Sequence, residues 1–364
     1  MQKQGKIIAA LAIAVTVIFV LLMFQGGPFR KSETERSTLT DEDAALRYPY
    51  QTLNPKERAL YATLYQAMSE HRENVRLPYR YSGEEYERVY LMIRMQEPQF
   101  FYVADYYQLS PVMTETEIQY DLDTAKCEEM TEELEKAADQ IIDDLKYGDS
   151  DLEKLLDIHD AIAKGCMYYQ VGYSAEAYGC LVKGNALCEG YAKAFTYVAR
   201  RAGLEAFCVS GISANGEAHV WNIFQTGGKY YNVDVTWDDE QMLKGTVSHR
   251  YFAVSDERFA KHRADLSCFE PPACTGDDKQ HYINHGMILN ELSQLTLKVN
   301  EWAAQVQNSS RVIEFYCTTQ AVYQSAIEDI KTGNQVGGVL ASYTETASFR
   351  YIADPEGQII TIIF

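Results

Sequence analysis

The apolar positions between residues 191 and 202 recur at the three- and four-residue spacing of a helix. They are Tyr191, Ala194, Phe195, Val198 and Ala202. Gly203 is suited to end this helix, and Asn185 is suited to cap its start. Cys188 then falls in the first helical turn, where the positive end of the helix dipole favours the thiolate, the nucleophilic form of the thiol. Gly190 has no side chain, which leaves space beside Cys188.

After this helix the pattern changes and predicts three strands. They cover residues 205–212, 219–225 and 229–236. Gly227 and Gly228 join the second strand to the third as a two-residue turn. In that register Trp221 faces Asp234, and His219 and Asp234 become diagonal neighbours; a turn one residue earlier pairs them directly. Both registers place the two side chains on one face, because the side-chain period is two, and only an odd-length loop would separate them.

Cys188 precedes His219 by 31 residues, and His219 precedes Asp234 by 15. These three side chains can form a nucleophile, a base and a group that orients the base. The helix that carries Cys188 must bury its apolar face, and the neighbouring sheet is the obvious partner. A lone cysteine on such a helix is usually a core residue. An ionised Asp234 inside an apolar strand is costly without a partner, so the combination favours a functional pairing.

Three motifs carry a resemblance to a known family. They are Leu187-Cys188-Glu189-Gly190-Tyr191-Ala192, His219-Val220-Trp221-Asn222 and Tyr231-Asn232-Val233-Asp234-Val235-Thr236-Trp237-Asp238-Asp239. With weaker matches at 155–160 and 250–256, the segment from about residue 150 to 275 resembles the bacterial transglutaminase-like domains, which share a core architecture with papain-like cysteine proteases. Three ordered motifs with compact spacing are a stronger signal than any one of them.

The resemblance implies an α+β fold. We expect a transglutaminase-like (papain-like) core in which the nucleophile helix packs on an antiparallel sheet, flanked by N- and C-terminal α/β modules. The predicted parts are a membrane anchor at 1–30, a linker at 31–47, an N-terminal α/β region at 48–148, the catalytic core at 149–283 and a small α+β module at 284–364. The flanking elements that we expect are a strand at 112–120, a helix at 127–146, a strand at 312–317, a helix at 322–331 and a hairpin at 349–364.

The resemblance also implies a reaction. Cys188 would attack a carboxamide or peptide carbonyl, His219 would exchange protons, and Asp234 would hold His219, giving a thioester acyl-enzyme. Water then takes the acyl group in protease-like members and an amine takes it in transglutaminases, and the sequence does not choose between them. The Cys188 amide is the one oxyanion donor that we can name. Val182 and Lys183 occupy the region where papain-like proteases have a glutamine.

Two alternatives to an active enzyme remain at this stage. One is a catalytically silent transglutaminase-like binding module at the cell surface, and the other is a scaffolding protein dominated by its flanking domains. Trp221 and Trp237 are candidates for lining a substrate groove, with core packing as the alternative for both.

An apolar run from Ile7 to Phe24 follows Lys3 and Lys6 and is just long enough to span a bilayer. It lacks the small-x-small exit of a cleaved signal peptide, so it predicts an uncleaved single-pass anchor. We expect the N-terminus inside the cell and the body on the extracytoplasmic side, where the partner would be a peptide or protein substrate, with cell-wall peptide as one option.

The composition of 46% hydrophobic residues predicts a folded chain, and its 364 residues are enough for two or three domains. Beyond residue 30, 30 basic residues stand against 52 acidic ones, a net charge of −22. Such a body is repelled by nucleic acid, so no nucleic-acid partner is expected. We expect no cofactor and no metal. Cys268 and Cys274 lie near His262 and His281, but their spacings match no compact zinc-finger pattern.

Overall fold

The computed structural model describes residues 39–145, 150–239, 247–306, 312–332, 335–343 and 349–364. The predicted anchor at Ile7 to Phe24 lies outside these residues, as do residues 31–38 of the predicted linker, whereas residues 41–45 of that linker form helix α3. Among the helices that the structure describes, none combines the length and the apolar character that a membrane span requires.

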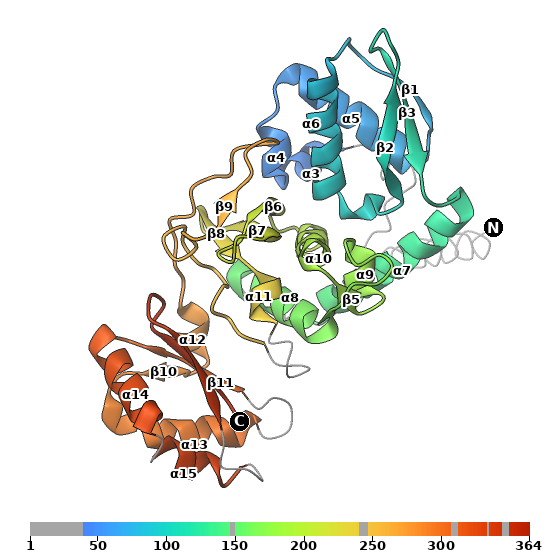
Figure 1. Cartoon of the computed structure of the whole chain (residues 1–364). Coiled ribbons are helices and arrows are strands. Elements are labelled where there is room, and N and C mark those ends of the chain that lie inside the picture. Colours follow the sequence, from blue (N-terminus) through green and yellow to red (C-terminus); the bar gives the residue numbers. More distant parts are fainter. Residues whose placement is uncertain (1–38, 146–149, 240–246, 307–311, 333–334, 344–348) are drawn as a thin grey trace, which may run out of the picture.

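The N-terminal region contains helices α3 to α6 and a small antiparallel sheet with strand order β1-β3-β2 (Figure 1). Its elements are α3 (Asp41–Ala45), α4 (Tyr48–Gln51), α5 (Pro55–Ser69), β1 (Asn74–Arg76), α6 (Gly83–Gln96), β2 (Val103–Leu109) and β3 (Glu115–Tyr120). Helix α5 begins after a capping box, in which Asn54 accepts from the backbone of Glu57 while the Glu57 carboxylate accepts from the backbone of Asn54. The strand expected at 112–120 is present as β3, but it starts three residues later, at Glu115.

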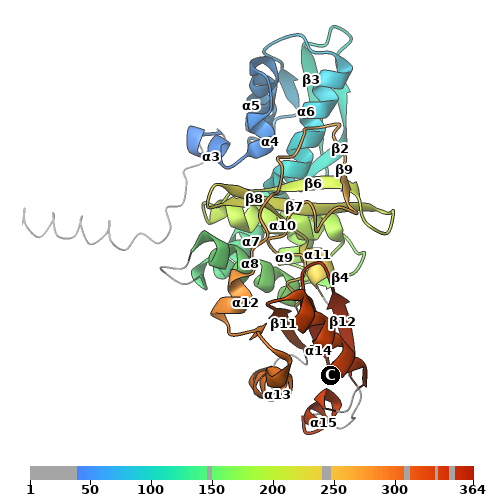
Figure 2. The same cartoon turned by 90° about the vertical axis from the view of Figure 1, so that its left-hand side faces the viewer.

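The central part is built around helix α10 and an antiparallel sheet with strand order β8-β7-β6-β9. Its elements are α7 (Thr124–Asp143), α8 (Asp151–Gly165), β4 (Met167–Tyr168), α9 (Ala177–Leu181), β5 (Asn185–Ala186), α10 (Cys188–Arg201), β6 (Ala206–Ile212), β7 (Ala218–Thr226), β8 (Lys229–Val233), α11 (Val235–Asp238) and β9 (Arg263–Ala264). Helix α10 packs on β6 and β7. Figure 2 shows α10 on one side of this sheet and the N-terminal helices α4 and α6 on the other.

The C-terminal part is a smaller α+β unit whose sheet has the order β10-β11-β13-β12. Its elements are α12 (Gln280–Asn284), β10 (Ile288–Leu289), α13 (Leu295–Val306), β11 (Val312–Cys317), α14 (Gln320–Thr332), α15 (Val336–Leu340), β12 (Arg350–Asp354) and β13 (Ile359–Ile363). Strand β11 has the predicted bounds, and the predicted terminal hairpin is the β12–β13 pair.

Two large hydrophobic cores and a small cluster of Ala192, Cys208 and Val220 lie within the described residues. One runs without a break from Leu53 in the N-terminal region to Cys274 at the end of the central part. The other lies between Leu289 and Ile362. The N-terminal region and the central part therefore share one apolar interior, whereas the C-terminal part has its own.

The structure confirms the mixed fold with a nucleophile helix on an antiparallel sheet, and it corrects two local predictions. Asn185 does not cap the helix: it pairs in β5, and Leu187 holds the N-cap position without a side-chain hydrogen bond. The third strand stops at Val233 rather than at residue 236, because Asp234 caps a short helix instead. Gly203 does follow the helix with a positive φ of 78°, a conformation that favours glycine.

Candidate active site

The hairpin of β7 and β8 positions His219 and Asp234. Gly227 and Gly228 have φ values of 58° and 76°, as a two-residue turn of the primed type requires. The ladder then pairs Thr226 with Lys229, which is the predicted register. His219 lies on β7, and Asp234 directly follows the last paired residue of β8. The Gly-Gly turn therefore sets the strand register that brings these two side chains together.

The Asp234 carboxylate is fixed through both of its oxygens. Oδ2 accepts from His219 Nε2 at 2.7 Å, and Oδ1 accepts from the backbone N–H of Trp237 at 3.1 Å. Asp234 is 1% exposed and His219 is 7% exposed. A buried carboxylate that accepts two hydrogen bonds has little rotational freedom, so it holds the imidazole in one orientation.

Cys188 is the first residue of α10 and is partly exposed. The helix start fits tightly against the preceding chain: a Cβ on Gly190 would collide with the carbonyl of Ser174 and with the side chain of Ala186. The Cys188 N–H belongs to the first helical turn and has no acceptor within the helix. Cys188 therefore combines an accessible thiol with a backbone donor that points out of the helix end.

Asn222 couples the helix of Cys188 to the strand of His219. Its side chain is 1% exposed, and its Nδ2 donates to the Ala192 carbonyl and to Thr196 Oγ1, both at 2.9 Å. Both acceptors lie on α10, whereas Asn222 lies on β7 three residues after His219. The sequence motif that begins with His219 thus contains the residue that sets the distance between the thiol and the imidazole.

The Cys188 thiol lies close enough to His219 to influence the pKa of the imidazole. Because His219 Nε2 faces Asp234, Nδ1 is the nitrogen that can exchange a proton with the sulfur. Burial alone would lower the pKa of His219, but the hydrogen bond to Asp234, the interaction with Cys188 and the charges of both groups raise it to about 10. At neutral pH the imidazole is therefore held as the imidazolium, the form that stabilises a thiolate.

The two tryptophans named from the sequence occupy different environments. Trp221 is 4% exposed, packs on Phe259 and donates to Asn232 Oδ1 at 3.2 Å, which corresponds to the packing alternative. Trp237 is partly exposed, and its ring lies 5.7 Å from that of His219. A role for Trp237 in the substrate groove stays a prediction.

The sequence did not single out His262 as part of this site. Its ring stacks on Phe259 at 3.8 Å and lies 4.7 Å from Trp237 and 6.0 Å from His219. Burial lowers the pKa of His262 to about 4, against the opposing influence of Asp234, so it is a neutral neighbour of the imidazolium. Only the fold brings it here, because 43 residues separate it from His219.

An exposed apolar strip beside Cys188 was also missed. It runs along β4 and the following loop and consists of Met167, Tyr168, Tyr169, Val171 and Tyr173, which are 36% to 65% exposed. The Tyr168 ring stacks on that of Tyr191 at 6.4 Å. Burial raises the pKa of Tyr168, and the Cys188 charge raises it further. The tyrosines that precede Cys188 in the sequence were the signal that could have indicated this strip.

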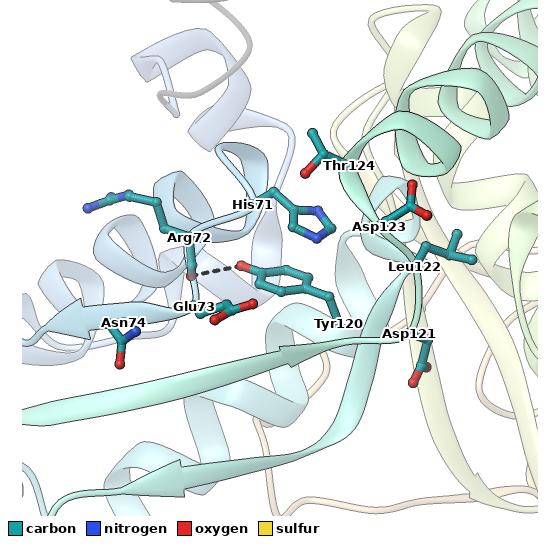
Figure 3. Close-up of a pocket in the computed structure, with 9 residues that line it drawn as sticks. All are labelled: His71, Arg72, Glu73, Asn74, Tyr120, Asp121, Leu122, Asp123 and Thr124. Atoms are coloured by element: carbon teal, nitrogen blue, oxygen red, sulfur yellow. Dashed lines mark hydrogen bonds between the residues drawn. The ribbon is translucent and has the colours of Figure 1, made fainter.

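A pocket of about 670 Å³ lies elsewhere, in the N-terminal region (Figure 3). It is lined by residues 71–74 and 120–124. His71 stacks on Tyr120 at 3.9 Å, and the Tyr120 hydroxyl donates to the Arg72 carbonyl at 3.0 Å. None of the three predicted site residues lines this pocket, so its size does not mark the candidate active site.

Three groups of described side chains have metal-ligating atoms within 4.8 Å of one another. They are His219, Asp234 and His262; His159, Asp160 and His249; and His249, His281 and Glu314. All eight cysteines are free, so Cys268 and Cys274 form no local disulfide.

Comparisons with known proteins agree with the resemblance seen in the sequence. Residues 135–235 match the family model of the transglutaminase-like superfamily. This match contains Cys188, His219 and Asp234. No curated protein matches the chain significantly.

Among solved structures, the chain is similar to the "Putative Cysteine Protease from Cytophaga hutchinsonii", with 18% identity, a TM-score of 0.25 and coverage of 35% of this chain and 45% of that one. It is similar to a TGase with 13% identity, a TM-score of 0.29 and coverage of 60% and 65%. It is also similar to menin with 11% identity, a TM-score of 0.28 and coverage of 79% and 66%. The chain thus spans less than half of the first of these structures and under two thirds of the second.

Proposed function

We propose that the protein is a cysteine enzyme of transglutaminase-like type that acts on amide or peptide bonds through Cys188, His219 and Asp234. The observation that supports this most is the position of His219, which hydrogen-bonds to the buried carboxylate of Asp234 and has the partly exposed thiol of Cys188 as a neighbour that raises its pKa. That arrangement provides a nucleophile, a proton carrier and an orienting group in one cluster.

The first half-reaction forms a thioester. Cys188 Sγ attacks the carbonyl carbon, and the carbonyl π electrons move to oxygen, where the Cys188 N–H can donate to the oxyanion. When the tetrahedral species collapses, the C–N bond breaks and the imidazolium of His219 gives its proton to the leaving nitrogen. The products are ammonia or an amine, a thioester on Cys188 and a neutral His219.

The second half-reaction breaks the thioester. Water or an amine attacks its carbonyl carbon, and neutral His219 takes the proton that the nucleophile loses. The C–S bond then breaks and the thiolate of Cys188 is restored beside the imidazolium. Attack by water gives hydrolysis and attack by an amine gives acyl transfer, so the same three residues serve both reactions.

The exposed apolar strip at residues 167–173 is proposed to hold the acyl-donor chain. It lies beside the nucleophile, because the backbone N–H of Tyr169 donates to the Ala186 carbonyl, two residues before Cys188. Exposed aromatic side chains supply contact area with little loss of side-chain entropy on binding. A peptide or protein with an apolar side chain near the reactive amide fits this surface.

The proposal also includes the predicted location. The apolar run from Ile7 to Phe24 supports a single membrane anchor with the body on the extracytoplasmic side. The test is a fractionation of cells that express the full chain. Carbonate-resistant membrane association, together with digestion of the body by protease added to wall-stripped cells, supports this topology, whereas a body protected until permeabilisation contradicts it.

The reaction is tested by labelling the full-length protein with an iodoacetamide probe near neutral pH. Cys188 is expected to react much faster than Cys208, which is fully buried and whose pKa burial raises to about 11. His219→Ala is expected to remove the fast phase, and Cys208→Ser is the matched control that keeps it. Equal labelling rates at Cys188 and Cys208 would favour a catalytically silent binding module. Release of peptide against incorporation of a labelled amine then separates hydrolysis from transfer.

A further inference from the structure

A second polar cluster lies between the central part and the C-terminal part, where Figure 1 shows α12 and β11 next to α8 and α11. We call it the seam cluster. It consists of His159, Asp160, Asp238, His249, His281 and Glu314, four of which are buried, while Asp160 and His249 are partly buried. The reaction proposed above uses none of these side chains, so their burial calls for a separate explanation.

Glu314 is the acceptor at the centre of the cluster. It lies on β11, is 5% exposed, and its Oε1 accepts from Ser248 Oγ at 2.9 Å and from Thr361 Oγ1 at 3.0 Å. Its Oε2 accepts from the Tyr282 hydroxyl at 3.0 Å. Burial alone would raise the pKa of Glu314, but the hydrogen bond and charge of His249 lower it to about 2. Glu314 is therefore a fixed carboxylate.

His249 lies between two carboxylates. Its Nδ1 is 3.0 Å from Glu314 Oε2, and its Nε2 is 2.8 Å from Asp160 Oδ1. Histidines that bind a metal through one nitrogen usually donate the other N–H to a carboxylate, which fixes the ring and its tautomer. Asp160 stands in that supporting position if Nδ1 is the ligand atom.

The environment of His281 differs from that of His249. It is 5% exposed, and its Nε2 is buried without a hydrogen-bond partner among the described residues. Buried polar nitrogens are almost always paired, so an orphan beside a carboxylate is informative. A neutral imidazole with a free nitrogen is the form that binds a metal ion. The ring centroid of His281 is 4.8 Å from that of His249.

We propose that His249, His281 and Glu314 bind one divalent transition-metal ion, with zinc as the best fit, and that a water molecule completes the coordination. The donor set of two imidazoles and one carboxylate suits zinc. Ligand atoms around a tetrahedral zinc ion lie roughly 3.3 Å apart, given bonds of about 2.0 Å. The 3.0 Å between His249 Nδ1 and Glu314 Oε2 is close to that value. All three ligand atoms lie within 4.8 Å of one another, so His281 needs to move by at most about 1.5 Å.

Metal binding at this place exchanges a proton for the ion. His249 loses the Nδ1 proton that it shares with Glu314 and keeps the Nε2 proton that it donates to Asp160. The ion would then join α12 and β11 of the C-terminal part to the segment at residues 248–249 of the central part. This inference departs from the expectation of no metal drawn from the sequence, and it does not rest on the proposed function.

The other two groups are weaker metal sites. In the group of His159, Asp160 and His249, both ring nitrogens of His159 already have partners, Asp160 Oδ1 at 3.2 Å and Asp238 Oδ2 at 3.3 Å. In the group of His219, Asp234 and His262, the ring of His219 is held by Asp234 and Cys188. Only the third group has an orphaned nitrogen on a side chain that is at least nine-tenths buried.

The test uses full-length protein in detergent, stripped with a chelator and then given Zn²⁺ alone. Cys188→Ser with His219→Ala forms the background, because a thiol and an imidazole together also attract zinc. We expect one zinc per chain after desalting and a melting temperature that rises with zinc concentration. Cobalt in place of zinc should give the visible absorption of a tetrahedral ion.

The decisive variant is His281→Gln, which removes the orphaned ligand and leaves the hydrogen bonds of Glu314 in place. Zinc affinity is expected to fall at least tenfold, and Asp160→Asn should weaken it by roughly 10- to 100-fold through the supporting carboxylate. His285→Gln is the matched control, since among the described residues the His285 ring bonds to the His281 backbone carbonyl, at 2.8 Å, and to no side chain of the cluster. Zinc that binds as tightly to His281→Gln as to the parent, or that is absent from the background variant, would overturn the proposal.

Discussion

His219 is buried and His249 is partly buried, and each lies between two partners, yet their surroundings suit opposite tasks. His219 lies between the Asp234 carboxylate and the thiol of Cys188, and that thiol is partly exposed. His249 lies between the carboxylates of Asp160 and Glu314. An imidazolium beside a thiolate has a group that can attack a substrate, whereas an imidazolium between two carboxylates can only hold them together or yield its proton to a metal ion.

The two histidines also differ in which parts of the molecule supply their partners. The residues that hold His219 belong to one hairpin and one helix of the central part, so their geometry is set within a single unit. The partners of His249 come from α8 and from β11 of the C-terminal part. Damage at the first site should therefore cost activity, and damage at the second should cost the attachment of one unit to the other.

The largest expected effect tests the first half of this comparison. Asp234→Asn should lower turnover by about 10⁴-fold, because the amide favours the wrong imidazole tautomer. The fold should persist, since asparagine also serves as an N-cap for the helix that Asp234 starts. Steady-state kinetics and a thermal melt separate the two readouts. Normal turnover, or loss of the fold, would mean that the carboxylate is structural.

The expectation that damage around His249 costs stability is tested by Asp160→Asn. Breaking a buried ion pair costs about 3–5 kcal/mol, and the 23% exposure of the Asp160 side chain reduces the expected loss to roughly 2–4 kcal/mol. Turnover of the folded protein should stay unchanged. Asp151→Asn on the same helix is the control, because Asp151 is 57% exposed and its variant should stay within about 0.5 kcal/mol of the parent. Denaturant unfolding measures both.

These two sites also differ in what the sequence can predict. The register of β7 and β8 was predictable because a Gly-Gly turn fixes the pairing, and the order of Cys188, His219 and Asp234 followed a family pattern. The start of α10 was not, because Asn185 is used in strand β5 instead of as a cap. The predicted end of β8 was wrong for a local reason: Asp234 caps a turn of helix where alternation suggested three more strand residues.

The seam cluster left no readable signal, because its members come from residues 159 to 314 and only the docking of two units brings them together. A sequence pattern describes one element at a time, whereas a buried charge network between units depends on how those elements pack. The exposed strip at Met167 to Tyr173 is an intermediate case: its aromatic residues are visible in the sequence, but their position beside Cys188 depends on the pairing of β4 with β5.

A smaller expected effect is the dependence of kcat/KM on pH. The pKa of His219 is raised above its ordinary value, so the imidazolium and the stability that it contributes are fully present below about 6.5 and are lost as the pH rises through about 10. Release of the leaving amine needs that imidazolium, so kcat/KM should fall about tenfold per pH unit above 10. A profile that falls already near pH 7 would show that His219 is not held as a cation.

The smallest expected effect concerns the surface that binds the substrate, and it compares two equally exposed tyrosines. Tyr169 is 65% exposed in the strip next to Cys188, and Tyr106 is 62% exposed on β2 of the N-terminal region. Tyr169→Ser should raise KM by about 3- to 10-fold with little change in kcat, because it removes roughly 1 kcal/mol of contact made equally in the ground and transition states. Tyr106→Ser should leave both constants unchanged. If both variants behave alike, the strip is an ordinary exposed surface, and the substrate approaches Cys188 from the side of Trp237 and His262.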